Sequence, residues 1–215
     1  MNRAVIAIVK GGLGNQLFIY AAARALALRT GCQLYLDIKR GYTLDTYGRS
    51  YRLNRFPIRA EIMPEAWRVA PTLKHPRHKL IRAINKLLPR DRRDYFAERW
   101  TLPPSQLIDL RPERDRITLL GYWQDEAYFA DCTDTIRAEL APSSPNDARN
   151  RLLGEELAGT ESVFVHVRRV SYPAALPADY YRTALTEARR SLVRPRFVIF
   201  GDDLAWAKSE LGLGA

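Results

Sequence analysis

The first forty residues alternate apolar and polar segments in an order that predicts a strand, a helix and a second strand. Residues 4–9 form a continuous apolar run rich in β-branched side chains and followed by glycines, which is typical of a buried strand in a parallel sheet. Apolar residues then recur at helical spacing over 15–29, and the pattern stops at Gly31. With a strand over 33–37, this order predicts a βαβ unit with a parallel sheet and a right-handed crossover.

The middle of the chain gives a weaker pattern. Between residues 39 and 76 tyrosine, arginine and proline are scattered, and the only element predicted there is a short helix over 65–69. From 80 to 88 leucine and isoleucine recur at spacings of three and four, which predicts an amphipathic helix with a basic outer face. A strand over 117–123 and a helix over 125–140 are expected to follow.

A segment rich in Pro, Ser, Asn and Asp separates these elements from a second α/β unit. Residues 142–147 are predicted to be a linker. Beyond it we expect a helix, a strand, a helix, a strand and a short helix, over residues 147–157, 162–168, 178–192, 196–200 and 204–211. The predicted domains are therefore a Rossmann-like one over 1–141 and a partial one, with two strands, over 148–215.

Composition narrows the class of protein. The 215 residues are 47% hydrophobic and 27% charged, which is the balance of a folded globular chain. Cys32 and Cys132 match no zinc or redox spacing, so neither a metal site nor a disulfide framework is expected. The apolar runs are shorter than a membrane span and the start is unlike a signal peptide, so a cytoplasmic protein is expected.

The positive charge of the chain is concentrated in one stretch. Residues 68–116 hold 13 Lys or Arg against 6 Asp or Glu, out of a net charge of +10. Lys79, Arg82 and Lys86 fall on one face of the helix predicted there, which fits a solvated surface, peripheral contact with an anionic membrane, or contact with an acidic polymer. No nucleic acid is expected, because the stretch has no binding motif and few aromatic residues for base stacking.

The loop after the first strand is the first candidate ligand site. It contains Gly12, Gly14, Asn15 and Gln16, at a helix N-terminus and at the strand end where parallel sheets bind ligands. A dinucleotide site is supported by Asp37 at the end of the second strand, but a leucine occupies the place of the third glycine. The other interpretations are a tight structural turn with Asn15 as helix cap, and a sugar or nucleotide-sugar cleft.

Two more clusters follow the predicted strands of the second unit. His166 and Arg168 alternate onto one face near the end of a strand, and Arg169 comes next. Guanidinium groups bind phosphate with two hydrogen bonds and keep their charge, so they can neutralise a diphosphate leaving group without a metal. Structural ion pairing is the alternative. Asp202 and Asp203 could bind a metal, bond to ligand hydroxyls or cap the next helix.

Four motifs along the chain resemble the α-1,2-fucosyltransferases of glycosyltransferase family 11. They are GGLGNQLFIYAAARALA at 11–27, GYWQDEAYF at 121–129, HVRRVSY at 166–172 and FGDDLAW at 200–206. The resemblance implies inverting transfer of L-fucose from GDP-fucose to the 2-hydroxyl of a galactose-terminated glycan, with no cofactor and no obligatory metal. It also implies an α/β, GT-B-like fold of two Rossmann-like halves facing a cleft, with the second half incomplete.

The resemblance also implies roles for individual residues. Arg168 would be the catalytic residue that binds the GDP phosphates, with His166 and Arg169 in support. Domain 1–141 would be the acceptor side and domain 148–215 the donor side. The other substrate-binding residues that it implies are Gly12, Gly14, Asn15, Gln16, Asp202 and Asp203.

Two features depart from the family pattern. Ser171 stands where an acid usually follows the H-x-R-R motif, and family chains usually continue beyond the FGDD element. A truncated or inactive relative that binds little or no donor is therefore an alternative to the active enzyme. An NAD-binding oxidoreductase, supported by Asp37 and the glycine loop alone, is a weaker one.

Overall fold

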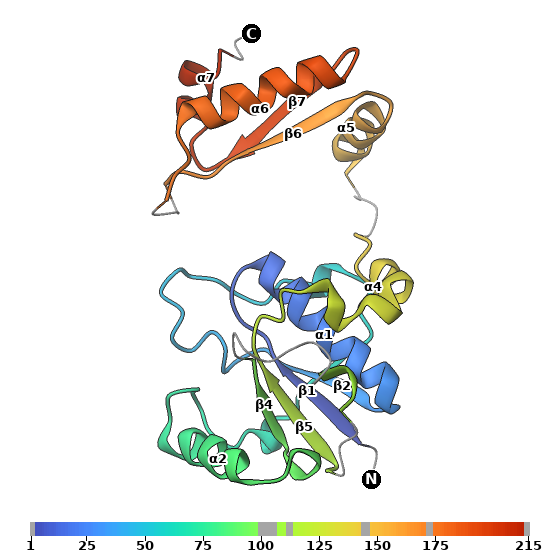
Figure 1. Ribbon diagram of the computed structural model, residues 1–215, viewed down its shortest axis with the longest axis vertical. Helices are drawn as coiled ribbons and strands as arrows, with labels where there is room; N and C mark the ends of the chain where they lie inside the picture. The colour runs from blue at the N-terminus through green and yellow to red at the C-terminus, as the bar shows by residue number, and fades with distance from the viewer. Residues whose placement is uncertain (1–2, 99–106, 111–113, 143–146, 171–173, 213–215) are drawn as a thin grey trace. The chain divides into compact units, whose positions relative to one another are not determined.

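The chain divides into two units with parallel sheets. The computed structural model describes residues 3–98, 107–110, 114–142, 147–170 and 174–212, and the contacts within it separate Met1–Ser143 from Ser144–Ala215. That boundary falls inside the segment 142–147. Both units combine parallel strands with helices, which confirms the α/β class (Figure 1). In the described ranges no helix is long and apolar enough to cross a membrane.

Unit 1 is built on a five-stranded sheet in the order β3-β2-β1-β5-β4, and every pairing in it is parallel. The strands are β1 (Ala4–Ile8), β2 (Gln33–Asp37), β3 (Glu61–Ile62), β4 (Tyr95–Ala97) and β5 (Arg116–Leu120). The central β1 is buried throughout, as its uninterrupted apolar sequence predicts. The short β3 and β4 were not predicted from the sequence, since two or three residues are too few to show a period.

Helix α1 (Leu13–Thr30) packs along β1 and β2 and is buried over most of its length. Its alanines allow the helix backbone to lie close to the sheet. It ends where the sequence predicts, because Gly31 adopts a left-handed φ of 64° and its N–H bonds back to the carbonyl of Leu28. The βαβ unit expected at the start of the chain is confirmed.

The helix predicted over 125–140 is wrong for its first half. The structure has two 3₁₀ turns, η4 (Glu126–Tyr128) and η5 (Ala130–Cys132), before the short helix α4 (Thr133–Glu139). Arg29 from α1 donates to the carbonyl of Tyr128 at 2.7 Å, which takes that acceptor away from a helical ladder. Phe129 between the turns has a φ of −141° and a ψ of 16°, which are not helical values. The strand predicted over 117–123 likewise ends earlier, at Leu120.

Helix α2 (Pro76–Leu87) is present, but the inward packing expected of its apolar side is wrong for three of the five apolar residues, and the other two, Ile81 and Leu88, are half-buried. His78 and Asn85 are its buried residues, while Leu80, Ile84 and Leu87 are 60%, 49% and 87% exposed. The side chain of Asn85 bonds to the carboxylate of Asp94 and accepts the backbone N–H of that residue, which ties the polar side of the helix to the start of β4. The predicted helix over 65–69 is a single 3₁₀ turn, η2 (Glu65–Trp67).

The remaining 3₁₀ turns of unit 1 are η1 (Leu53–Arg55) and η3 (Arg90–Arg92).

Unit 2 contains α5 (Ala148–Ala158), β6 (Ser162–Val167), α6 (Ala178–Ser191), β7 (Arg196–Gly201) and α7 (Leu204–Glu210). Its two strands pair in parallel, with Ser162 opposite Arg196 and Val167 opposite Gly201. In its buried cluster Val167 of β6 packs with Tyr181 and Leu185 of α6, with Ala207 of α7 and with Leu211, which directly follows α7. The helix–strand order predicted for this unit is confirmed.

Candidate functional site

The glycine loop connects the end of β1 to the start of α1. The residue that requires glycine there is Gly11, because its φ is +76° and a Cβ would lie 2.6 Å from the amide nitrogen of Asn15. Gly12 is the N-cap of α1, and a Cβ on Gly12 or Gly14 would meet no atom within 4 Å. These two glycines therefore leave open space in front of the helix N-terminus, where backbone N–H groups favour anions.

The two amides of this loop have different surroundings. The turn interpretation expected Asn15 to cap the helix, but Asn15 makes no capping bond. Its side-chain oxygen instead accepts a 2.7 Å hydrogen bond from Gln124, in the loop after β5. Gln16 is completely buried, donates to the carbonyls of Gly11 and Ser50, and accepts the N–H of Arg52. Backbone groups bond to both ends of its amide, so Gln16 holds the loop in place, and its contact with substrate stays a prediction.

Asp37 at the end of β2 is also engaged inside the unit. Its carboxylate pairs with the guanidinium of Arg40 and accepts the backbone N–H of Lys39, and it is only 1% exposed. A ribose hydroxyl would have to displace these bonds. The observation that supported a dinucleotide site is thereby lost.

Two hollows that the sequence did not predict lie at the carboxyl end of β1. The first also borders the ends of β4 and β5, and the second borders the loop that follows β2. Lys10 and Tyr122 line both of them, and the volumes are about 330 and 340 Å³. Burial lowers the pKa of Lys10, an effect that Glu98 opposes and Arg82 reinforces. Of these residues only Tyr122 lies in a motif quoted above, and no spacing in the sequence relates Lys10 to Glu98.

In unit 2, the strand β6 presents alternate residues to opposite sides. Val165 and Val167 pack with the buried cluster, whereas His166 and Arg168 are exposed. The imidazole of His166 stacks on the ring of Phe200 with a centroid distance of 4.8 Å and an angle of 6°. The strand ends at Val167, so Arg168 begins the loop.

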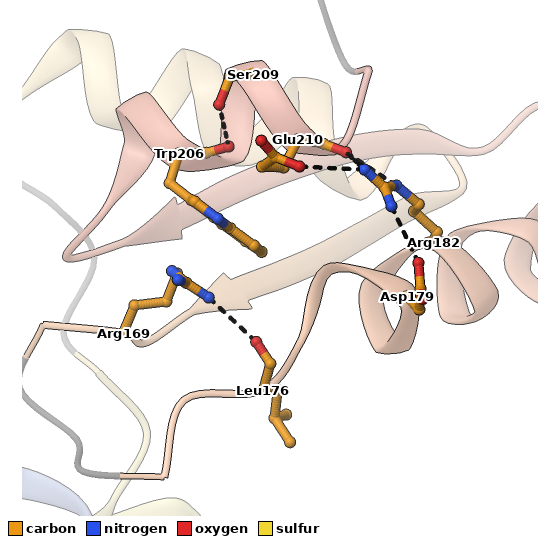
Figure 2. Close-up of polar contacts among 7 residues, drawn as sticks. All are labelled: Arg169, Leu176, Asp179, Arg182, Trp206, Ser209 and Glu210. Carbon is orange, nitrogen blue, oxygen red and sulfur yellow. Dashed lines mark hydrogen bonds and ion pairs between the residues drawn. The ribbon is translucent and has the colours of Figure 1, made fainter.

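Arg169 folds back onto its own unit. Its guanidinium lies 3.8 Å from the ring centroid of Trp206, a cation–π contact that the sequence did not predict. It also donates to the carbonyl of Leu176 at 3.2 Å (Figure 2). The same guanidinium lies 3.5 Å from the carboxylate of Asp203. These contacts give Arg169 a role in holding the loop that carries Arg168.

The two aspartates after β7 organise the same loop. Asp202 accepts the backbone N–H of Arg169 at 2.7 Å and of Val170 at 3.3 Å. Asp203 caps α7 by accepting the N–H of Trp206 at 3.1 Å, which was one of the roles expected for this pair. Gly201 is required between strand and loop, since its φ is 151° and a Cβ would overlap the carbonyl of Val167.

Metal ligands are not grouped in the described part of the chain, where no cluster of three or more His, Cys, Asp or Glu side chains could hold an ion. Ser171, which replaces the acid of the family pattern, lies outside the described residues. Glycine and arginine loops after parallel strands define the class of protein: an α/β chain with candidate ligand-binding loops at its strand ends.

The family follows from comparison with known proteins. The model of glycosyl transferase family 11 matches residues 4–213, and the chain belongs to this family. It is therefore a glycosyltransferase, and the family expected from the four motifs is confirmed. Family membership leaves the oxidoreductase alternative without support.

Similar proteins agree with this assignment. An α-1,2-colitosyltransferase of Escherichia coli is 27% identical over 218 residues, which are 95% of this chain and 70% of that protein. The fucosyltransferase NodZ from Bradyrhizobium is 20% identical with a TM-score of 0.50, over 100% of this chain and 77% of its own. NodZ α-1,6-fucosyltransferase co-crystallised with GDP has a TM-score of 0.51 at 19% identity, over 100% and 76%. The GT-B-like fold class is thereby confirmed.

Proposed function

We propose that this glycosyltransferase moves L-fucose from GDP-fucose to the 2-hydroxyl of a galactoside, with inversion at the fucose. The observation that carries the proposal is the arginine loop of unit 2, in a chain of family 11. Arg168 is exposed at the end of β6, while Arg169 and Asp202 hold the loop through side-chain contacts. This arrangement places the exposed side chain of Arg168 on a loop whose course is fixed by the contacts of Arg169 and Asp202.

The reaction needs a displaced diphosphate and an activated hydroxyl. The acceptor oxygen attacks C1 of fucose as a base removes its proton, the bond between C1 and the phosphate oxygen breaks, and GDP leaves with the electron pair. Negative charge develops on that diphosphate, where the fork of Arg168 fits two oxygens. Transition-state stabilisation by one such donor is commonly worth about 3–4 kcal/mol.

The donor sugar is the first point to test, because a similar protein is a colitosyltransferase. Colitose differs from fucose in lacking the 3-hydroxyl. Purified protein is incubated with lactose as acceptor in three separate reactions, which contain GDP-fucose, GDP-colitose or UDP-galactose as donor. The linkage of each product is determined by NMR. We expect an α-1,2 product from GDP-fucose. Transfer from UDP-galactose alone would contradict the proposal. Transfer from GDP-colitose alone would contradict fucose as the donor sugar and assign colitose in its place.

An inactive relative remains the alternative, since Ser171 replaces an acid of the family pattern. Calorimetric titration with GDP distinguishes the two, because an active enzyme must bind the leaving nucleotide. Arg168→Lys should weaken GDP binding, and Arg149→Lys on exposed α5 is the matched control. Absence of GDP binding in the unaltered protein would favour the inactive relative.

We also propose that this enzyme is cytoplasmic and contacts an anionic membrane peripherally through α2. The structure changes the physical basis expected for that contact, because the outward side of the helix is apolar. Leu80, Ile84 and Leu87 form an exposed stripe, and Lys79 and Lys86 are exposed beside it. A stripe of this kind with basic flanks suits the boundary between lipid headgroups and acyl chains.

Vesicle sedimentation tests the membrane contact. Binding to vesicles with phosphatidylglycerol should exceed binding to phosphatidylcholine alone at low salt, since each nearby lysine adds about 1 kcal/mol. Leu87→Gln should reduce binding, because this side chain is 87% exposed and its loss leaves the fold intact. Leu152→Gln, at an exposed leucine of α5, is the control. If the protein does not sediment with anionic vesicles, the membrane contact is refuted and the outward side of α2 is a solvated surface.

A further inference from the structure

The two hollows of unit 1 lie side by side at the carboxyl ends of the strands, because Lys10 and Tyr122 line both. Volumes of about 330 and 340 Å³ are at the lower end of the range for small-molecule sites. Gln124 reaches the first hollow and bonds to Asn15 of the glycine loop. Amide groups of this kind recognise hydroxyls, so the rim of the hollow suits a sugar.

The first hollow carries an excess of positive charge. The ammonium of Lys10 lies 4.2 Å from the ring centroid of Tyr122. Among the described side chains, no carboxylate is within ion-pairing distance of Lys10 or of Arg82, which lines the same hollow. The carboxylate of Glu98, also in the lining, accepts the backbone N–H groups of Tyr122 and Trp123. Two cations therefore face one carboxylate that is already hydrogen-bonded.

The second hollow repeats this imbalance. Arg49 is paired with Asp45 at 2.8 Å, and Arg40 is paired with a buried aspartate. Lys74 and Lys10 line the same hollow, and within the described ranges neither has a carboxylate partner. Lys10 thus lies where two positively charged hollows meet.

We propose that these hollows form the acceptor site and select a galactoside that carries a carboxylate or a phosphate, with Lys10 binding the anionic group. The inference rests on the proposed transfer to a galactoside and adds the charge of the acceptor. An anion at Lys10 gains a charge-assisted hydrogen bond in a partly desolvated place, with Arg82 and Lys74 on either side. A neutral galactoside gains only the hydroxyl contacts at the rim.

The donor diphosphate is the competing anion for these cations. Under the proposed function it is bound by Arg168, which belongs to the other unit. Substitutions at Lys10 should therefore leave GDP affinity unchanged. Loss of GDP binding in such a variant would reassign the hollows to the donor.

Acceptor binding can be measured without any donor, so the test does not depend on turnover. Four probes are titrated by calorimetry at low salt: lactose, its carboxylated counterpart lactobionate, galactose, and galactose 6-phosphate. We expect at least one anionic probe to bind about tenfold more tightly than its neutral counterpart. The two pairs separate a carboxylate from a phosphate as the preferred group.

Lys10→Met should remove this preference, while lactose affinity and GDP affinity stay as they are. Lys86→Met, which removes the same charge from exposed α2, is the control and should keep the preference. Arg82→Met gives an independent variant with a smaller expected loss, should Lys10→Met fail to fold. Equal binding of charged and neutral probes, or a preference that survives in both variants, would overturn the acceptor assignment. Failure of the proposed function alone would appear as absent GDP binding with the preference intact.

Discussion

The sheets of the two units are both parallel and both end in a loop with candidate ligand-binding residues, but they differ in burial. All of β1 is buried, and Leu36 and Leu119 of the neighbouring strands are at most 1% exposed. In β6 and β7, by contrast, only Val167 is buried, and Phe164 and Phe200 are 60% and 46% exposed. The same local motif is thus held by a thick apolar core in unit 1 and by a thin one in unit 2.

This difference decides what fixes each loop. In unit 1 the glycine loop is fixed from inside by completely buried Gln16, and its course requires the positive φ that Gly11 adopts. In unit 2 the arginine loop is held at the surface by the bond of Asp202 to the Arg169 N–H and by the contacts of the Arg169 guanidinium with Asp203 and Trp206. Unit 1 should therefore be sensitive to apolar substitutions and unit 2 to polar ones.

The largest expected effect is on the core of unit 1. Leu119→Ala should lower the free energy of unfolding by about 3–4 kcal/mol, because it opens a cavity in the central sheet. Phe164→Ala on β6 should cost about 0.5 kcal/mol or less, since most of that ring is already in water. Hydrogen exchange read by mass spectrometry reports each unit separately. A loss at Phe164 as large as that at Leu119 would refute the contrast in burial.

The next effect concerns ion pairs. Glu139 accepts hydrogen bonds from Arg24 and Tyr20, and its side chain is 10% exposed. Glu139→Gln should therefore cost about 2 kcal/mol in unit 1, by leaving a partly buried guanidinium without its charge partner. Glu156→Gln in unit 2 removes the partner of Arg196 from a pair with both side chains at least 41% exposed, and should cost less than about 0.5 kcal/mol. Urea unfolding measures both, and similar losses would show that exposure does not separate the pairs.

The fold could be predicted where its signal is local. The run over 4–9 and the helix that ends at Gly31 show it, since period, apolar continuity and a C-cap all lie within a few residues. The course of 125–140 could not be predicted in the same way. There Arg29, a hundred residues away in sequence, captures a carbonyl that a helix would use. For α2, buried Asn85 draws the polar side inward through contacts with β4.

The candidate site was predictable only in part, for a similar reason. Motifs located the loops that carry Arg168, Asp202 and the glycines. The partners of each side chain depend on tertiary contacts, such as Trp206 under Arg169, and Lys10 meeting Tyr122 across the ends of two strands. Residues with no motif around them, such as Glu98, become visible only when the strands are assembled.

A smaller effect, on ligand affinity, sharpens the comparison within unit 2. Arg168→Lys should weaken GDP binding about tenfold, because a lysine keeps the charge but loses the bidentate fork. Arg169→Lys should change GDP affinity less and the melting temperature of unit 2 more, since Arg169 contacts Trp206 and the carbonyl of Leu176. Calorimetry and thermal unfolding of the same two variants separate binding from stability. If both variants lose the same GDP affinity, the two arginines do not have the different orientations and roles inferred here.

The smallest expected effect is a pH dependence at the surface of unit 1. The guanidinium of Arg29 lowers the pKa of Asp131 to about 2, from a usual value of 3.8. A carboxylate with a depressed pKa stabilises the fold above its unfolded pKa, and that contribution is lost as the pH falls from about 4 towards 2. Because the Asp131 side chain is 52% exposed, solvent screening limits the contribution to less than about 1 kcal/mol.

Asp131→Asn should accordingly destabilise unit 1 at pH 6, and its difference from the unaltered protein should shrink as the pH falls from about 4 through 2. Asp179→Asn in unit 2 is the control, since its pair with Arg182 has side chains 88% and 50% exposed and offers less to lose. Added salt should shrink the Asp131 difference at pH 6, because the pair is only partly shielded from solvent. A destabilisation by Asp131→Asn that stays constant from pH 6 to pH 2 would mean that the aspartate acts through hydrogen-bond geometry and not through its charge.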